Sequence, residues 1–161
     1  KNPFFCTAGI GYDAFCADIF DKKTHGRGFL NYIKIVIFSI FKYIPQFTKF
    51  NGQGTEYFSI TFGNANQFGN NAYITPDAHI SDGYLDCTII KKHPIYYDFA
   101  LMYLLMSKKI RSSRYVEYYR ATKFTLENTG KAKMHIDGDP LEVEDHNILI
   151  EVNEKSLSVT V

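Results

Sequence analysis

Short runs of apolar and aromatic residues, separated by Gly, Asn, Asp and Pro, constrain the fold of this 161-residue chain more than any other feature of its sequence. Phe and Tyr supply 14 and 12 residues, and Trp is absent. Aromatic runs of this length between turn-forming residues are typical of β-strands. The expected strands are 4–10, 46–50, 56–62, 84–90, 123–126, 133–136, 147–152 and 157–161.

Three segments break this pattern and favour helices. The first is 13–20, which opens on Asp13, and the positive end of a helix dipole favours such an acidic residue. The second is the nearly continuous apolar segment 29–44, which stops before Pro45. It is shorter than the roughly 20 residues that cross a bilayer, so we expect a buried helix, with an interfacial helix as the alternative. The third is 95–106.

The expected architecture is α+β but mainly β, a β-sandwich or flattened barrel that carries two or three helices. Residues 51–54 have the composition of a hairpin turn. Residues 63–71 form a polar, Gly-punctuated segment that fits neither a helix nor a strand, and such loops are often functional. No repeat, low-complexity tract or linker divides the sequence, so residues 1–161 are expected to form a single domain.

Charge and cysteine content exclude several classes of protein. The 18 Lys and Arg residues against 17 Asp and Glu residues give a formal charge of +1, which disfavours general nucleic-acid binding. Three cysteines fit neither a zinc site of the CxxC type nor a disulfide framework, so a reducing, cytoplasmic compartment is expected. The first residues contain neither an initiator Met nor a secretory leader pattern, so we expect a piece of a longer chain.

Three polar clusters each place a carboxylate beside a glycine, at 9–14 (GIGYDA), 76–86 (PDAHISDGYLD) and 135–141 (HIDGDPL). Motifs of nucleotide-binding loops, serine hydrolases and zinc proteases are absent from the sequence. The simplest interpretation of the Asp-Gly pairs at 82–83 and 137–138 is a β-turn. The chemical alternative is that Asp77 and Asp82, with nearby carbonyls, hold a hard cation, while Asp137 and Asp139 accept a proton from a substrate hydroxyl.

In this order the clusters, together with the segments 62–66 and 68–71, resemble the C-terminal domain of the diacylglycerol kinase and sphingosine kinase family, which includes bacterial lipid kinases. The resemblance covers about residues 4–161. Its most specific part is the PDAxxxDGxLD pattern at 76–86, followed much later by DGxP at 137–140.

The resemblance implies an ATP-dependent lipid kinase of the NAD kinase and diacylglycerol kinase-like superfold. The γ-phosphate of ATP would pass to a hydroxyl of diacylglycerol or of a sphingoid base, the lipid substrate. ATP would be bound mainly by an N-terminal domain with a Gly-Gly-Asp-Gly-Thr motif, and this chain lacks that motif. The chain would therefore be the β-rich half of the kinase, and it is expected to be inactive without its N-terminal domain.

The resemblance also implies catalytic roles for two aspartates. Asp139 stands where the family usually has the Glu that acts as general base, and Asp137 opens the same motif. The shorter side chain makes Asp139 a weaker base unless the backbone brings it closer, because an error near 1 Å can cost about a hundredfold in rate. Asp13, in the first cluster, would face the cleft or the lipid head group and bind substrate.

The cofactor that the resemblance implies is a structural Mg²⁺. Its ligands would be the carboxylate of Asp82 and the main-chain carbonyls of His79 and Tyr84. His79 would thus serve through its backbone rather than its ring.

A basic run follows the third expected helix, at Lys108, Lys109, Arg111 and Arg114. Such a run favours the surface of an anionic membrane, and the alternative is a solvated helix end where cations complement the dipole. We therefore expect a cytoplasmic protein with peripheral contact at the inner membrane surface. A homodimer is left open.

Two other functions are compatible with these residues. One is a non-catalytic β-sandwich that binds a lipid or another small ligand, with Asp139 in place of Glu marking lost catalysis. The other is a kinase of the same superfold that acts on a non-lipid hydroxyl. The first predicts binding without turnover, and nucleotide substrates would reveal the second.

Overall fold

The protein folds into nine paired strands and three α-helices in the computed structural model, which describes residues 2–22, 29–127, 132–144, 146–154 and 156. The mainly β fold and the helices expected from the sequence are confirmed. In chain order the elements are β1 (Thr7–Gly11), α1 (Tyr12–Asp21), α2 (Phe29–Ser39), β2 (Gln46–Phe50), β3 (Gln53–Gly63), β4 (Leu85–Lys91), the 3₁₀ turn η1 (Ile95–Tyr97), α3 (Asp98–Met106), the 3₁₀ turn η2 (Ile110–Ser112), β5 (Val116–Ala121), β6 (Lys123–Glu127), β7 (Ala132–Ile136), β8 (Asp139–Val143) and β9 (Asn147–Glu151).

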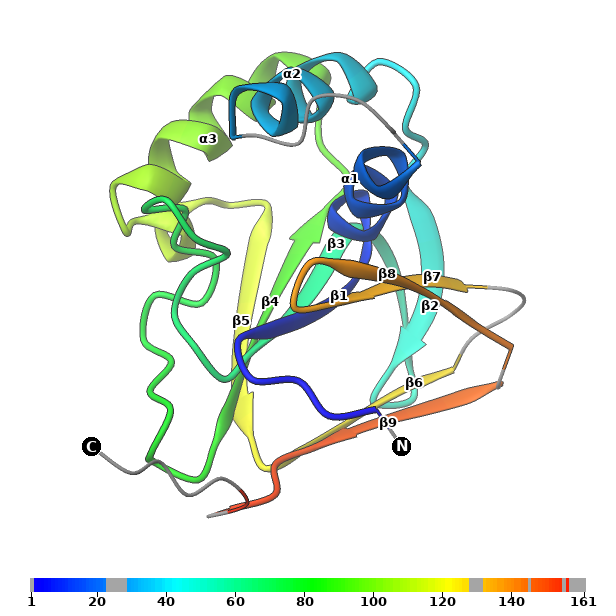
Figure 1. Ribbon diagram of the computed structural model, residues 1–161, viewed down its shortest axis with the longest axis vertical. Helices are drawn as coiled ribbons and strands as arrows, with labels where there is room; N and C mark the ends of the chain where they lie inside the picture. Colours follow the sequence, from blue (N-terminus) through cyan, green and yellow to red (C-terminus); the bar gives the residue numbers. More distant parts are fainter. Residues whose placement is uncertain (1, 23–28, 128–131, 145, 155, 157–161) are drawn as a thin grey trace.

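Strand β3 is the centre of the sheet, because it pairs with three other strands along its length. Residues 53–57 pair with β2, which continues through β6 to β9. Residues 59–63 pair with β1 on one edge and with β4 on the other. β1 continues through β7 to β8, and β4 continues to β5. The change of partner coincides with a register shift between Tyr57 and Ser59, where a bulge bends the strand. The sheet thus divides into two branches that share β3 (Figure 1). One branch holds β2, β6 and β9, and the other holds β1, β7 and β8 with β4 and β5.

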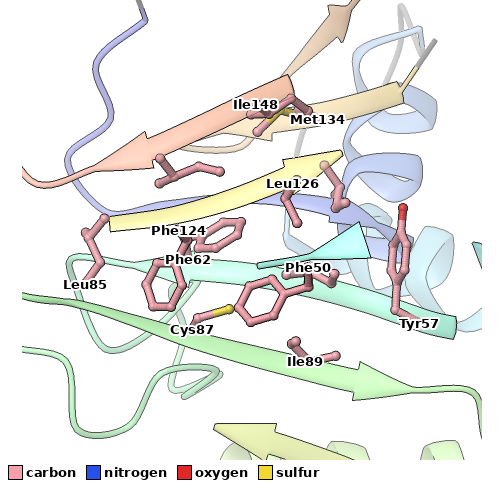
Figure 2. Packing of buried hydrophobic residues seen from close by; sticks show 13 residues of the cluster. Phe50, Tyr57, Phe62, Leu85, Cys87, Ile89, Phe124, Leu126, Met134 and Ile148 are labelled. Atoms are coloured by element: carbon pink, nitrogen blue, oxygen red, sulfur yellow. The ribbon is translucent and has the colours of Figure 1, made fainter. Parts of the chain in front are cut away.

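The main hydrophobic core fills the space between the two branches. Alternate residues of the strands point inward, as Ile60 and Phe62 do in β3 and Phe124 and Leu126 do in β6, and none of these four is more than 1% exposed. The rings of Phe62 and Phe124 come from opposite branches, and their centroids lie 5.4 Å apart. Figure 2 shows both rings in the middle of the cluster, beside Phe50 of β2. This packing makes the domain sandwich-like.

The three helices cover the outer face of the sheet at one end of the molecule (Figure 1). α1 packs on β1, β7 and β8 and joins α2 through Tyr12, Cys16 and Ile35. α3 packs on β4 through a cluster that includes Leu101. Phe58 of β3 contacts both clusters and so connects the helices to the sheet.

Several boundaries differ from the expected ones. Helix α2 ends at Ser39 rather than at residue 44, because the amides of Lys42 and Tyr43 both donate to the Ser39 carbonyl (2.9 and 3.1 Å) and close a turn before Pro45. The expected helix 95–106 begins as the 3₁₀ turn η1. Strand β1 begins three residues later than expected, at Thr7.

Other differences concern strands and turns. Strands β5 and β8 were not expected; β8 contains Pro140, which an edge strand tolerates, and among the described strands β8 pairs only with β7. The hairpin turn between β2 and β3 is confirmed but shorter, because Phe50 pairs with Gln53 and leaves two residues in the turn. The expected strand 157–161 lies outside the described residues.

None of the helices in the described ranges is long and apolar enough to cross a lipid bilayer.

Candidate functional site

A row of buried polar positions crosses the outer face of the sheet, on the side opposite the main core. Strand register places Thr88 of β4, Thr61 of β3, Gly9 of β1 and His135 of β7 next to one another. Thr61 and Thr88 are fully buried and His135 is 3% exposed. Buried polar groups need hydrogen-bond partners, so this row requires polar contacts from the segments that cover it.

Asp13 covers the row from the first turn of α1. Its Oδ2 accepts a hydrogen bond from Thr61 Oγ1 (2.7 Å) and lies 3.2 Å from Nε2 of His135. Gly9 permits this approach, because a Cβ atom there would lie 2.4 Å from the Asp13 carboxylate and 2.9 Å from the His135 ring. Only 10% of the Asp13 side chain is exposed. The predicted substrate ligand is thus also part of a buried polar network.

The polar loop that follows β3 covers the same row. The ring of Phe68 lies 6.0 Å from that of His135, and Thr88 Oγ1 donates to the carbonyl of Ile74 (2.6 Å). Nδ1 of His135 is buried and has no hydrogen-bond partner in the part of the chain that the structure describes. Gly63 is the last residue of β3, whereas residues 64–71 form the loop that the sequence predicted, and this loop lies over the polar row.

The Asp-Gly pair at 137–138 forms a two-residue hairpin turn between β7 and β8. Ile136 pairs with Asp139, and Asp137 and Gly138 have φ angles of 51° and 95°, as a type I′ turn requires. The Asp137 carboxylate accepts the backbone amides of residues 5, 6 and 7, at 2.8, 2.8 and 3.0 Å. Asp137 therefore holds the chain before β1 against the turn. The role of proton acceptor expected for it stays a prediction.

Asp139 has a different environment from Asp137. It is exposed, and its carboxylate has no hydrogen-bond or ion-pair partner among the described residues. It lines a depression of about 300 Å³ between the C-terminal part of α1 and the hairpin turn; the lining residues are Ala17, Phe20, Asp21, Asp137, Gly138, Asp139 and Pro140. Of the two predicted catalytic aspartates, Asp139 is the one free to meet a ligand.

The Asp-Gly pair at 82–83 lies in a turn that also contains the other two residues predicted to hold Mg²⁺, His79 and Tyr84. The amide of Asp82 donates to the carbonyl of His79 (3.3 Å), and its Oδ1 accepts the amide of Tyr84 (2.9 Å). Its Oδ2 forms an ion pair with Arg120 of β5, whose guanidinium stacks over the Tyr84 ring at 4.9 Å.

The donors of this turn fit a hard cation in kind. A carboxylate and carbonyl oxygens are the ligands that Mg²⁺ prefers. The described residues contain no group of three or more metal-ligating side chains, so a cation here would depend on main-chain carbonyls. Arg120 already balances the charge of Asp82 and would compete with the cation.

Asp86 lies just beyond this turn, on the outer face of β4. It is completely buried, and neither of its carboxylate oxygens has a hydrogen-bond partner among the described residues. Burial is the largest cause of a raised pKa at Asp86. The Tyr118 hydroxyl and the positive charge of Arg120 lower this pKa, whereas the negative charges of Asp82 and Asp77 raise it further. A buried carboxyl of this kind favours protonation or a ligand.

Strand register places the two Asp-Gly turns at the same end of the sheet. Asp86 pairs with Gly63, Gly63 pairs with Thr7, and the Thr7 carbonyl accepts the amide of Asp137 (2.8 Å). Three steps between strands at about 4.8 Å each place Asp86 roughly 14 Å from Asp137, and the turn at 82–83 lies just before Asp86 in the chain. The predicted base and the predicted cation turn thus lie along one edge of the domain.

Sequence reasoning did not identify Thr61, His135 and Asp86 as parts of the site. Each alternates along its strand with residues that face the core, such as Phe62 and Met134. A polar side chain at an alternate position of an otherwise buried strand was the available signal. That signal does not reveal which residues these side chains contact, because the contacts come from other strands and from α1.

The chain matches the family model described as the YegS C-terminal NAD kinase beta sandwich-like domain over residues 6–161. It is similar in structure to a candidate diacylglycerol kinase from Bacillus anthracis strain Sterne, with a TM-score of 0.62 and 18% identity over 92% of this chain and 50% of that one. A diacylglycerol kinase structure from the same strain has a TM-score of 0.55 and 17% identity over 92% of this chain and 47% of its own. The chain therefore spans about half the length of these structures. No curated protein matches it.

Proposed function

We propose, from the premise that this chain belongs to the family of YegS C-terminal NAD kinase β-sandwich-like domains, that it is the lipid-binding and base-supplying half of an ATP-dependent lipid kinase. ATP would be bound mainly by an N-terminal domain, and the phosphate acceptor would be a lipid hydroxyl, in diacylglycerol or a sphingoid base. The similarity to diacylglycerol kinase structures supports this substrate class.

The observation that carries the proposal is the environment of Asp139. Its exposed carboxylate lines the depression beside α1 and has no partner among the described residues, so it is free to accept a proton. As the lipid oxygen forms its bond to the γ-phosphorus, its proton passes to Asp139, and the bond from that phosphorus to the ADP oxygen breaks. Asp137 contributes by fixing the turn through residues 5–7. It is a positioning residue.

Asp13 would contact the substrate head group through the small part of its carboxylate that remains exposed. Its Oδ2 already accepts a hydrogen bond from the Thr61 hydroxyl and lies beside Nε2 of His135, so the orientation of the carboxylate is set before a ligand binds. Preorganised polar groups of this kind orient a ligand at little cost in entropy.

The turn at 79–84 would hold Mg²⁺ through the carboxylate of Asp82 and the carbonyls of His79 and Tyr84. A bound cation there would reduce the negative charge at the edge that faces the phosphates. We expect Mg²⁺ to raise the melting temperature of the intact protein, and to raise it more in Arg120→Gln, which lacks the competing guanidinium. Arg114→Gln, an exposed arginine stacked on Tyr115, is the control. If Mg²⁺ changes the melting temperature of neither the wild type nor Arg120→Gln, the proposed Mg²⁺ site is contradicted.

The reaction is tested by following labelled phosphate from ATP into a panel of lipids with the intact protein. Asp139→Asn should lower transfer about a hundredfold or more, because a positioned general base contributes that much. Glu142→Gln, an exposed position on the same strand, should leave the rate unchanged. Absence of transfer to every lipid, with the protein folded and ATP bound, would reject a lipid kinase for this panel.

The shorter carboxylate at position 139 is the observation that favours the second candidate, a non-catalytic domain that binds a lipid or another small ligand. That function predicts lipid binding without phosphate transfer. Nucleotides in the same panel test for a kinase of this superfold that acts on a non-lipid hydroxyl.

A further inference from the structure

Two side chains of β7 hold helix α1 against the sheet, and we name these two contacts the α1 anchor. In the first turn of the helix, Oδ2 of Asp13 lies 3.2 Å from Nε2 of His135. Five residues further on, Oδ2 of Asp18 accepts a hydrogen bond from Nζ of Lys133 at 2.5 Å. One strand is thus joined to two places on one helix.

The two contacts of the α1 anchor reach different faces of the helix. An α-helix turns by about 100° per residue, so the side chains of Asp13 and Asp18 leave it about 140° apart. Lys133 and His135 alternate with Met134, which belongs to the core, and they therefore point to the same side of β7. A single contact would leave the helix free to turn about its axis. Two contacts on different faces oppose this rotation and fix the position of α1 as well.

The two contacts differ in burial. The side chains of Asp13 and His135 are 10% and 4% exposed, so solvent weakens this contact little. Asp18 is 16% exposed and Lys133 is 43% exposed, so the second contact is partly screened. Burial raises the pKa of Asp18, but hydrogen bonds from Lys133 and Lys22 oppose it and the net shift is downward. The Asp18 carboxylate is therefore a charged partner for Lys133.

Helix α1 supplies one side of the proposed acceptor site. It carries Asp13, and it carries three residues that line the depression together with Asp139: Ala17, Phe20 and Asp21. The turn that bears Asp139 is held separately, because Asp137 accepts the amides of residues 5–7. A shift or rotation of α1 would therefore change the lipid side of the depression and leave the predicted base in place.

We propose that Lys133 and His135 are positioning residues that set the lipid side of the depression through α1. His135 is nearly buried and Lys133 is engaged by Asp18, so both act on the substrate through carboxylates of the helix. The inference rests on the proposed function, since it assigns the lipid to this depression. It concerns lipid affinity, so its first test requires no ATP.

The first test compares two lysines that contact the same carboxylate. Binding of dioctanoylglycerol and of sphingosine, each in detergent micelles, is measured with the intact protein. Lys133→Met should weaken binding of the lipid that the wild type binds by about threefold, because it removes the partly exposed contact of the α1 anchor. Lys22→Met is the matched control: Lys22 also donates to Asp18, at 2.9 Å, but from within α1. It makes the same change of charge and should leave the affinity unchanged.

The second test separates the hydrogen bond of His135 from the packing of its ring. His135→Leu fills a similar volume without a donor and should weaken binding about tenfold, because the Asp13 carboxylate loses a partner. His135→Gln keeps an N–H group that can reach Asp13, and it should restore most of the affinity. The double variant Lys133→Met and His135→Leu should lose more than the product of the single losses, since each single variant keeps one contact on α1.

Phosphate transfer provides a readout that a merely structural role would not move. Variants of the α1 anchor should raise KM for the lipid and leave kcat unchanged, because Asp137 still holds the turn of Asp139. A lower kcat at unchanged KM would indicate general destabilisation and overturn the positioning role. Equal affinities of Lys133→Met and Lys22→Met, or equal losses in His135→Leu and His135→Gln, would overturn it as well.

The same measurements distinguish failure of this inference from failure of the proposed function. If the wild type binds and phosphorylates a lipid and the anchor variants match it, the inference is wrong and the lipid kinase stands. If the wild type binds lipid without phosphate transfer and the anchor variants bind more weakly, the inference stands and the kinase reaction is rejected. A wild type that neither binds nor phosphorylates either lipid would reject both.

Discussion

At the scale of single residues, Asp137 and Asp139 show how little the identity of a side chain says about its task. The two carboxylates are separated by one glycine in one hairpin turn. Asp137 accepts three backbone amides from residues more than a hundred positions away, whereas Asp139 is exposed and faces the depression beside α1. The first is suited to hold the fold and the second to react.

The two positions should therefore separate stability from activity. Asp137→Asn should lower the free energy of unfolding by about 1–2 kcal/mol, because the amide loses the charge that strengthens its hydrogen bonds. Asn tolerates the positive φ of this position, so the backbone is preserved. Asp139→Asn should change that free energy by less than about 0.5 kcal/mol. Urea unfolding of both variants measures the difference, and equal losses would contradict the assignment.

His135 is the second residue for which the contacts make a prediction. His135→Ala should lower the free energy of unfolding by about 1–3 kcal/mol, because it removes a buried ring and leaves the Asp13 carboxylate with one partner fewer. His146→Ala, at an exposed position, is the control and should be nearly neutral. Thermal or urea unfolding compares them, and a neutral His135→Ala would show that the polar row does not depend on this ring.

At the scale of elements, the junction between β4 and α3 depends on one histidine. His93 follows β4, and its side chain is 1% exposed. Its Nδ1 bonds to the Lys91 carbonyl (2.8 Å) and its Nε2 lies 2.6 Å from the Asp98 carboxylate, in the first turn of α3. Burial lowers the pKa of His93, but the Asp98 carboxylate and the Lys91 carbonyl raise it, and the net shift is upward. The folded junction therefore binds a proton on His93 more tightly than the unfolded chain does.

This shift predicts a pH dependence with a definite sign. A raised pKa in the folded state stabilises the fold below the unfolded-state pKa of about 6.5, and the contribution is lost as pH rises through the folded-state value. The gap in unfolding free energy between the wild type and His93→Gln should therefore shrink from about pH 5.5 to about pH 8.5. The gap to Asp98→Asn should shrink in the same direction. Gaps that stay constant over this range would contradict the role of the pair.

At the scale of the whole molecule, β3 decides the architecture because it belongs to both branches of the sheet. Its partners change at the bulge between Tyr57 and Ser59, and the core forms where the branches face each other. Phe124 of β6 and Phe62 of β3 meet across that space. The sandwich therefore depends on contacts between strands that are far apart in sequence.

Phe124→Ala tests this dependence. It should lower the free energy of unfolding by about 3–5 kcal/mol, because a large buried ring leaves a cavity between the branches. Leu149→Ala, half-exposed on the neighbouring strand β9, should change it by less than about 0.5 kcal/mol. Denaturant unfolding gives both values, and Phe124→Leu provides a milder variant if the alanine protein does not fold. A small loss at Phe124 would contradict its position in the shared core.

Much of the fold and part of the site followed from the sequence. The family predicted from the three polar clusters is confirmed, and so are the mainly β class, most strands and all three helices. Strands β5 and β8 were missed because edge strands need not alternate clearly and can contain Pro. The roles predicted for Asp82, His79, Tyr84, Asp13 and Asp139 remain proposals.

The sequence by itself determined the local structure of this protein, because runs of apolar residues and Asp-Gly or Asn-Gly pairs favour strands and turns through interactions between near neighbours. Tertiary structure alone decided which strands are adjacent, since register is chosen by burying one face of every strand at once. That choice placed Gly9, Thr61 and His135 in one row and brought Asp137 to the amides before β1. It also left the outer face of α3 exposed, which no local pattern distinguishes from a buried helix.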